Sequence, residues 1–175
     1  PSVAYEVELT NGETKTIKSP EDMPDPSHIK EIREPMVALD VVSPEEYLGA
    51  VMQLAQNYRG RYSNTEYLSD SASEDRRVIL HYLIPLASIL VDFYDKLKSV
   101  SQGYASLNYE FKTYEPSDIV KMDILVAEEP VEALSMLVWR DSADSEGKRI
   151  VTVLKNTLER QQFVLKIQAA IGGKI

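Results

Sequence analysis

The stretch from Arg77 to Tyr114 changes its hydrophobic period twice, and this constrains the fold more than any other part of the chain. Apolar residues first alternate with other residues, as on a strand with one buried face, at Val78, Leu80, Tyr82 and Ile84. After Pro85, which suits the first turn of a helix, they recur at helical spacing at Leu86, Ile89, Leu90, Phe93, Tyr94 and Leu97. Gly103 follows, and alternation returns from Ala105 to Phe111. The stretch therefore predicts strand, helix and strand.

A similar pattern precedes this stretch. Val37, Leu39 and Val41 alternate, and Ser43-Pro44-Glu45-Glu46 is typical of a capped helix start. The helix is expected to bury Leu48, Val51, Met52 and Ala55 and to end at Gly60, before a strand at 61–68 and a polar loop at 69–76. Residues 35–115 thus predict the split β-α-β order of ferredoxin-like domains, an antiparallel sheet with both helices on one face.

The flanking segments predict further elements. Asn11-Gly12 joins two short strands in a hairpin, and the prolines of Ser19–Ser27 indicate a linker. After Pro116 the pattern predicts a hairpin, then a helix with an apolar stripe, then a strand beginning near Phe163; the stripe is Ile150, Val153, Leu154, Thr157 and Leu158. The predicted fold class is α+β, with the ferredoxin-like domain followed by a truncated second α+β domain.

Composition sets the outer limits. An apolar fraction of 43% and a charged fraction of 27% over 175 residues are those of an ordinary soluble globular protein. The chain has no cysteine, which excludes disulfides and thiolate metal sites, and it has no apolar run of about 18 residues. It begins with Pro1, so we expect it to be a piece of a longer protein. Its net charge of −9 argues against nucleic-acid binding unless a basic segment belongs to the rest of that protein.

Residues with catalytic potential are few. No phosphate-binding glycine-rich motif occurs, and His28 and His81 lack the spacing of metal ligands. Glu128-Glu129 is more typical of a solvated turn than of a catalytic pair. We therefore predict no catalytic residue, no GTP-binding residue, no metal site and no cofactor in this chain.

Two basic clusters remain. Arg59, Arg61, Arg76 and Arg77 lie near predicted turns, and Lys96 and Lys98 precede Gln102. Ordinary surface charge and contact with RNA phosphates both explain them, and the pattern alone leaves both open. Since the two helices should lie side by side, we expect their C-terminal ends, closed by Gly60 and Gly103, to open at the same rim of the sheet.

Several segments resemble the LepA family of translational GTPases, also called elongation factor 4 or back-translocase. They are IREPMVALDVVSPEEYLGAVMQLAQNYRG, IPLASILVDFYDKLKSVSQGYASLNYEF, ALSMLVWRD and RQQFVLKIQAAIGGKI, with SQGYASLNYEF and IQAAIG the most specific. The resemblance implies that 1–34 is the tail of a preceding domain and a linker. It implies that 35–115 is like the elongation factor G C-terminal domain and that 116–175 begins a LepA-specific domain.

The resemblance also implies a function. The parent would use GTP and Mg²⁺, bind the ribosome, its RNA and tRNA, and move tRNAs backward by one codon, which supports translational fidelity. It would lie in the cytoplasm and associate peripherally with the cytoplasmic face of the cell membrane, and this piece would be a monomer. The candidate RNA-contacting residues are Arg59, Arg61, Arg76, Arg77, Lys96, Lys98 and Gln102.

The chain departs from the family pattern at Leu83 and Ser88, where acids are usual. Two other functions fit the predicted fold. An acylphosphatase-like hydrolase would need an arginine in the loop after the first strand, where this chain has Val42-Ser43-Pro44. A regulatory ligand-binding module would need pocket residues, and none is evident in the sequence.

Overall fold

The computed structural model of the chain describes residues 3–68, 76–158 and 166–175 and divides them into two units. The first unit is residues 34–115, and the second combines the segment before residue 34 with the segment after residue 115. The boundaries lie within one residue of the predicted 34/35 and 115/116. The division into three domains stays a prediction, although the first and last segments fall in one unit.

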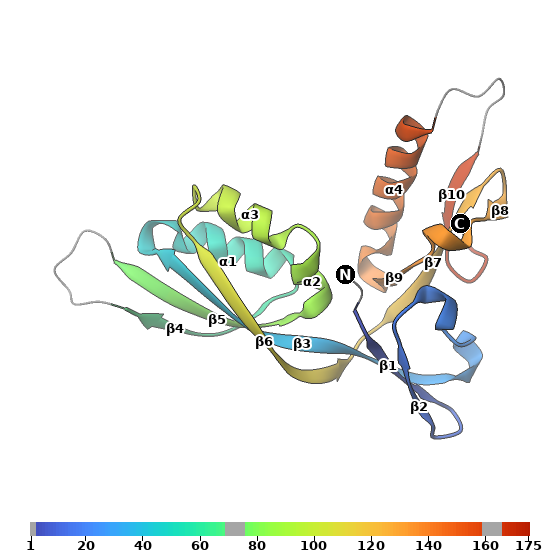
Figure 1. Cartoon of the computed structure of the whole chain (residues 1–175), viewed down its shortest axis with the longest axis horizontal. Helices are drawn as coiled ribbons and strands as arrows, with labels where there is room; N and C mark the ends of the chain where they lie inside the picture. Colours follow the sequence, from blue (N-terminus) through green and yellow to red (C-terminus); the bar gives the residue numbers. More distant parts are fainter. Residues whose placement is uncertain (1–2, 69–75, 159–165) are drawn as a thin grey trace. The chain divides into compact units, whose positions relative to one another are not determined.

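The first unit has the predicted order of elements. They are β3 (Ile29–Pro44, of which 34–44 belong to this unit), α1 (Leu48–Asn57), β4 (Arg61–Tyr67), β5 (Arg77–Pro85), α2 (Leu86–Leu90), α3 (Phe93–Val100) and β6 (Ser106–Pro116). β3 and β4 both pair antiparallel with β5, and β6 pairs with β3, so the strand order is β6-β3-β5-β4. All three helices lie on one face of this sheet (Figure 1). The ferredoxin-like α+β class is confirmed.

Alternation explains which face of the sheet is covered. Every second residue of β3 and β5 is buried against the helices, whereas the residues between them are only partly buried. The helices contribute Val51, Phe93 and Leu97, all 0% exposed, to the same core. Burial of each such side chain stabilises the fold by roughly 1.5–3 kcal/mol before entropy is subtracted.

The helices of this unit run in opposite directions. Tyr47, just before α1, stacks on Tyr104, just after α3, with ring centroids 6.2 Å apart. Tyr58, just after α1, contacts Phe93 at the start of α3 at 5.3 Å, and its hydroxyl lies 2.6 Å from Asp92 Oδ1. The start of one helix therefore lies beside the end of the other. The expectation that both C-terminal ends open at one rim was wrong, because strands β3 and β5, which lead into the two helices, are antiparallel.

The predicted helix after Pro85 is interrupted. α2 ends at Leu90, and Val91, with φ −84° and ψ −86°, breaks the helical geometry before α3 begins at Phe93. Val91 is 77% exposed and Tyr94 is 53% exposed, although Tyr94 belongs to the predicted stripe. The break turns α3 so that Phe93 and Leu97, four residues apart, face the core.

The expected helix start at Ser43 was also wrong. β3 continues to Pro44, a 3₁₀ turn spans Glu45–Tyr47, and α1 begins at Leu48. Ser43 is fully buried and donates its hydroxyl to the carbonyl of Pro44 at 3.0 Å, so it caps no helix.

The second unit contains two small antiparallel arrangements. Its elements are β1 (Tyr5–Leu9), β2 (Thr14–Ile17), residues 29–33 of β3, β7 (Ile119–Val126), β8 (Glu129–Pro130), β9 (Met136–Trp139), α4 (Ala143–Thr157) and β10 (Ile167–Ala170), with 3₁₀ turns at Pro20–Asp22, Pro26–His28, Glu132–Leu134 and Arg140–Ser142. β1 pairs with β2, as the hairpin prediction requires, and β1 also pairs with β3. β7 pairs with β8, β9 and β10. The segment predicted as a linker holds two of the 3₁₀ turns.

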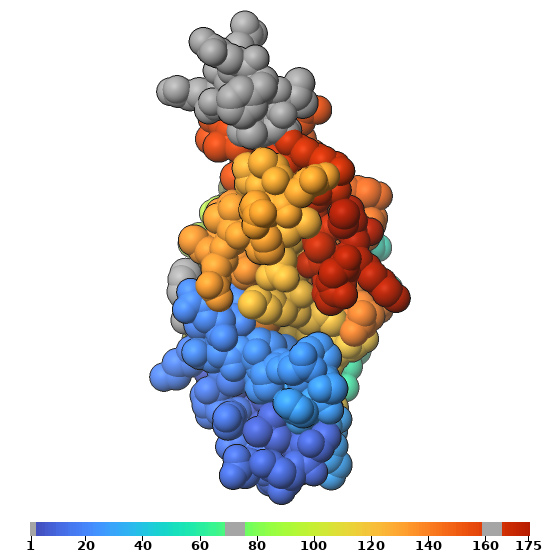
Figure 2. Space-filling view, turned by 90° about the vertical axis from the view of Figure 1, so that its right-hand side faces the viewer, coloured from blue at the N-terminus to red at the C-terminus, as the bar shows by residue number. Residues whose placement is uncertain are grey.

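A shared core joins the two segments of this unit. Val7 and Ile17 of the hairpin and Ile32 of β3 pack with Ile119 of β7, and Trp139 lies against them. Figure 2 shows the blue N-terminal residues beside the orange segment that contains β7 and β9. The apparent tail is thus part of the fold of this unit.

Helix α4 packs differently from its predicted stripe. Val153 is 52% exposed and Leu158 is 41% exposed, whereas Ala143 and Gly147 are buried. A Cβ added at Gly147 would lie 3.1 Å from the Cβ of Ala169, so the helix approaches β10 through its smallest residue. The predicted strand start at Phe163 and most of the predicted loop at 69–76 lie outside the described residues.

Phe93→Ala should lower the free energy of unfolding by roughly 3–5 kcal/mol, because the ring is fully buried and its removal leaves a cavity. Urea denaturation followed by circular dichroism measures the loss. Val91→Ala is the control, since it removes an apolar side chain that is 77% exposed and should change stability by no more than roughly 0.5 kcal/mol. Equal losses for both variants would contradict the orientation of α3 described here.

Candidate functional site

The predicted basic residues divide between the two ends of the first unit. Arg59 and Arg61 lie where α1 ends and β4 begins. The other end carries Arg76 and Arg77 at the start of β5, and Lys98 and Gln102 at the end of α3. These are brought together because Arg77 pairs with Pro44, just before α1, and the segment before α1 stacks on the segment after α3. We call this second group, Arg76, Arg77, Lys96, Lys98 and Gln102, the α3-end surface.

Arg59 is held by a buried carboxylate. Its guanidinium makes contacts of 2.5 Å and 3.3 Å with the two carboxylate oxygens of Glu34, which is only 3% exposed. Arg59 adopts a left-handed φ of 67°, and the amide of Gly60 donates to the carbonyl of Ala55 at 2.8 Å, which closes α1. A Cβ at Gly60 would lie 2.7 Å from that oxygen, so only glycine fits there. The geometry gives Arg59 a structural role at this helix end.

Arg61 makes a more exposed pair. One terminal nitrogen lies 2.6 Å and 2.7 Å from the two carboxylate oxygens of Glu115, and the arginine side chain is 58% exposed. An exposed pair of this kind contributes roughly 0–1 kcal/mol. Arg61 can therefore exchange this partner for another anion at little cost.

The cations of the α3-end surface are less constrained by acids. Arg76 lies 3.8 Å from Glu45, and both side chains are about half exposed. Within the described part of the chain, Arg77 and Lys96 form no ion pair within 4.0 Å, and both are exposed. No acid among the described residues therefore pairs with either charge.

The turn after α3 is rigidly built. The Lys98 ammonium donates to the carbonyls of Ala105 at 2.6 Å and Gly103 at 3.3 Å. Ser101 donates its hydroxyl to Leu97 and accepts from the amide of Ala105, at 2.8 Å and 3.0 Å. Gln102 and Gly103 both have left-handed φ values, 52° and 84°, which turn the chain toward β6. The backbone of this turn is thus fixed while the Gln102 side chain is exposed.

His81 lies between two acids on the sheet face opposite the helices. Its Nδ1 is 2.5 Å from Asp40 Oδ1 and its Nε2 is 3.0 Å from Glu66 Oε1. The hydrogen bond to Asp40 raises the pKa of His81 above its ordinary value, partial burial opposes the shift, and Glu66 adds to it. The arrangement stabilises an imidazolium. These contacts give His81 a structural role on the sheet.

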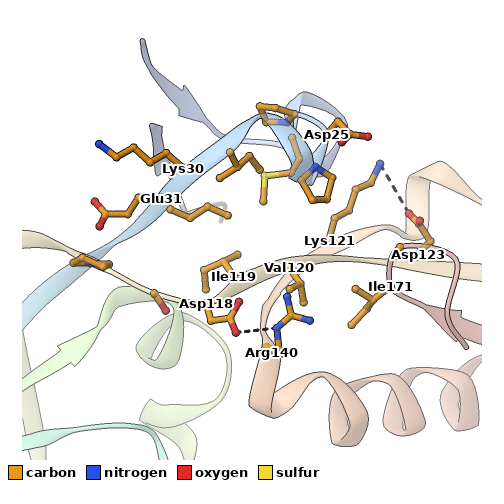
Figure 3. A pocket seen from close by; sticks show the side chains of 18 of the residues that line it. Asp25, Lys30, Glu31, Asp118, Ile119, Val120, Lys121, Asp123, Arg140 and Ile171 are labelled. Carbon is orange, nitrogen blue, oxygen red and sulfur yellow. Dashed lines mark hydrogen bonds and ion pairs between the residues drawn. The ribbon is translucent and has the colours of Figure 1, made fainter. Parts of the chain in front are cut away.

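The second unit contains a cavity that the sequence did not indicate (Figure 3). Its volume is about 940 Å³, and four separate segments of the chain line it. Arg140 donates to Asp118 at 2.8 Å at its edge, and Lys121 lies 3.9 Å from Asp123. Cations and acids among the lining residues balance each other: Lys30, Lys121, Arg140 and Lys174 against Asp25, Glu31, Asp118 and Asp123. With equal numbers of cations and acids, the lining favours neither an anionic nor a cationic ligand. The cavity could not be predicted from the sequence, because its lining comes from four separate segments.

Among residues 3–68, 76–158 and 166–175, no group of three His, Asp or Glu side chains could hold a metal ion. None of the helices in these ranges is long and apolar enough to cross a membrane.

Comparison with known proteins agrees with the ferredoxin-like unit. The family model of the elongation factor G C-terminus matches residues 31–125, more than half of the chain, and that of the GTP-binding protein LepA C-terminus matches residues 126–175. Three relatives named elongation factor 4 align over all 175 residues: those of Symbiobacterium thermophilum at 47% identity, Lacticaseibacillus casei at 50% and Streptococcus pneumoniae at 49%. The chain spans 28% of the length of these curated relatives.

Arg59→Ala should lower the free energy of unfolding by roughly 3 kcal/mol, because it leaves the Glu34 carboxylate buried without its guanidinium. Arg61→Ala, which breaks an exposed pair, should cost about 1 kcal/mol or less. Urea denaturation of both variants makes the comparison, and adding Glu34→Gln to Arg59→Ala should recover part of the loss. Equal small effects at the two arginines would mean that the Arg59 pair is not a structural one.

His81 should make stability depend on pH. Because the folded pKa lies above the unfolded value, its stabilisation is complete below the ordinary pKa of 6.5 and is lost as pH rises through the folded pKa. Asp40→Asn should lower the His81 midpoint in an NMR titration and flatten the decrease in stability that begins as the pH rises above 6.5. An unchanged midpoint in the variant would show that Asp40 does not cause the shift.

Proposed function

The chain belongs to the LepA family, whose members are named elongation factor 4, and on that premise we propose that it is the ribosome-binding C-terminal part of a translational GTPase. The observation that supports this most is the alignment of the whole chain with elongation factor 4 proteins at 47–50% identity. The parent would hydrolyse GTP with Mg²⁺ in domains outside these residues. This part would contact ribosomal RNA and tRNA during one-codon backward movement of tRNAs.

The α3-end surface is the part of the first unit that suits RNA contact best. Arg77 and Lys96 are exposed cations beside a fixed turn, and such residues can reach phosphates without being buried. Arg59 is occupied by Glu34 at the other end, and Arg61 contributes there as an exchangeable cation. Of the seven predicted contact residues, the five of the α3-end surface form the main proposed contact and Arg61 a secondary one. Arg59 supports the fold instead.

The open face of the sheet suits RNA less well. Its centre carries His81 between Asp40 and Glu66, so two carboxylates lie beside one imidazole there. Phosphates would be repelled by the excess negative charge. This electrostatic difference supports contact at the end of the unit over contact on its sheet.

The end of β3, where the sequence suggested a loop, gives no support to a hydrolase of the acylphosphatase kind. Ser43 is buried with its hydroxyl bonded to the carbonyl of Pro44, and no arginine occurs in Val42-Ser43-Pro44. An anion-binding loop needs free donors directed to one point. We therefore keep the translational function alone, with a cytoplasmic location and peripheral membrane association of the parent as parts of the proposal.

Arg77→Ala combined with Lys96→Ala should weaken binding of this chain to purified ribosomes at low salt. Each lost phosphate contact should reduce the slope of log affinity against log salt by about one. Titration of ribosomes into the fluorescently labelled chain, at several salt concentrations, measures both quantities.

The matched control is Lys15→Ala combined with Lys18→Ala, which removes two exposed cations from the β1–β2 hairpin segment of the other unit. It should leave the slope unchanged. If the Arg77 and Lys96 variant kept full affinity at both low and high salt, the α3-end surface would be excluded. If the unmodified chain did not bind ribosomes, the proposed function would be wrong for this part of the protein.

A further inference from the structure

Two tyrosine rings lie exposed beside the α3-end surface. Tyr104 follows the left-handed turn at Gln102-Gly103 and is 57% exposed, and Tyr94 on α3 is 53% exposed. Burial of such rings is ordinarily favourable, so an exposed pair next to cations is a candidate contact for a partner.

Tyr104 has a defined orientation. Its ring is nearly parallel to that of Tyr47, with an interplanar angle of 15° and centroids 6.2 Å apart. Tyr47 in turn packs against the core of the unit, while Tyr104 does not. One face of the Tyr104 ring is therefore supported by Tyr47, and the exposure of the residue leaves the opposite face open to solvent.

The backbone on both sides of Tyr104 is held in place. The Lys98 ammonium bonds the carbonyls of Gly103 and Ala105, and the Tyr104 amide donates to Ser101 at 3.0 Å. Lys98 also lies 5.6 Å from the centre of the Tyr94 ring, a cation–π distance. Little conformational entropy remains to be lost when a flat ligand stacks on Tyr104.

We propose that the open face of Tyr104 is a stacking site for an unpaired RNA base. This rests on the proposed function, which supplies the RNA. A flat aromatic face supported by Tyr47, at the end of the unit that carries the cations of the α3-end surface, matches the way proteins bind single-stranded RNA, where bases stack on aromatic rings and cations contact the backbone. Among the described residues, Glu45 lies 3.8 Å from Arg76, so this acid is paired with a cation.

The location differs from that of RNA-recognition domains with the same order of elements. Such domains stack bases on aromatic residues of the two central strands. Here the central strands β3 and β5 carry Asp40 and His81 on the open face, and the available rings lie at the end of the unit instead. Stacking is sequence-tolerant, so the site should accept any unpaired base.

The test compares Tyr104→Leu, which keeps an apolar side chain but removes the ring, with Tyr104→Phe, which keeps the ring. The control is Tyr62→Leu: Tyr62 is 52% exposed and contacts another ring, Tyr82, but it lies at the start of β4 next to Arg61. Two probes are used: purified ribosomes, and a single-stranded RNA oligonucleotide with one 2-aminopurine whose fluorescence falls on stacking.

We expect Tyr104→Leu to weaken oligonucleotide and ribosome binding by about tenfold or more and to abolish the stacking signal. The affinities of Tyr104→Phe and Tyr62→Leu for both probes should stay within about twofold of that of the unmodified chain, because surface substitutions usually have small effects. A fully paired RNA duplex should bind equally to all variants.

Other outcomes overturn the proposal in distinguishable ways. If the chain binds ribosomes and Tyr104→Leu binds them equally well, the stacking site is wrong and the proposed function stands. If Tyr104→Leu loses ribosome affinity but not oligonucleotide binding, the ring contacts a ribosomal protein and the base-stacking assignment is wrong. If the unmodified chain binds neither probe, both proposals are wrong.

Discussion

Burial of only one face of the four-stranded sheet is the constraint on which the first unit depends. Because alternate residues of β3 and β5 are covered and their neighbours are not, all three helices must pack on the same face. The strand order then makes β3 and β5 antiparallel, and the helices that follow them must run in opposite directions. Each end of the unit consequently presents the C-terminus of one helix and the N-terminus of the other. The distribution of cations between the two ends follows directly from this arrangement.

Local pattern predicted the elements well and their relations less well. The alternation at Val78–Ile84 and the helical spacing around Phe93 are short-range signals, and both agree with the structure. The break at Val91 was missed because the apolar spacing continues across it; only the Tyr58 contacts with Asp92 and Phe93 show why α3 is turned. Similarly, the N-terminal hairpin packs with Ile119 more than 100 residues later, and no periodicity within either segment reveals such a contact.

The candidate site was predictable only as a set of charges. Residue type identifies Arg59 as a cation, but its role depends on Glu34, which lies 25 residues away in sequence and is buried. The role of Lys98 likewise depends on the fold, because its ammonium donates to two backbone carbonyls. Tyr104 was assigned no role from the sequence. Availability of a charge, and not its presence, decides whether it can meet a ligand, and availability is a property of the folded state.

The two glycine-closed helix ends show how the same local device serves different purposes. In each, a non-glycine residue with left-handed φ precedes the glycine, and the glycine amide donates 2.8 Å to the carbonyl five residues earlier, from Gly60 to Ala55 and from Gly103 to Lys98. At Gly60 an added Cβ would collide with the Ala55 carbonyl, and the residue before it reaches inward to Glu34. At Gly103 an added Cβ would meet no atom within 4 Å, and Gln102 and Tyr104 are exposed. The first end is therefore committed to stability, whereas the second leaves exposed side chains, which the proposed RNA contact would need in a chain with a net charge of −9.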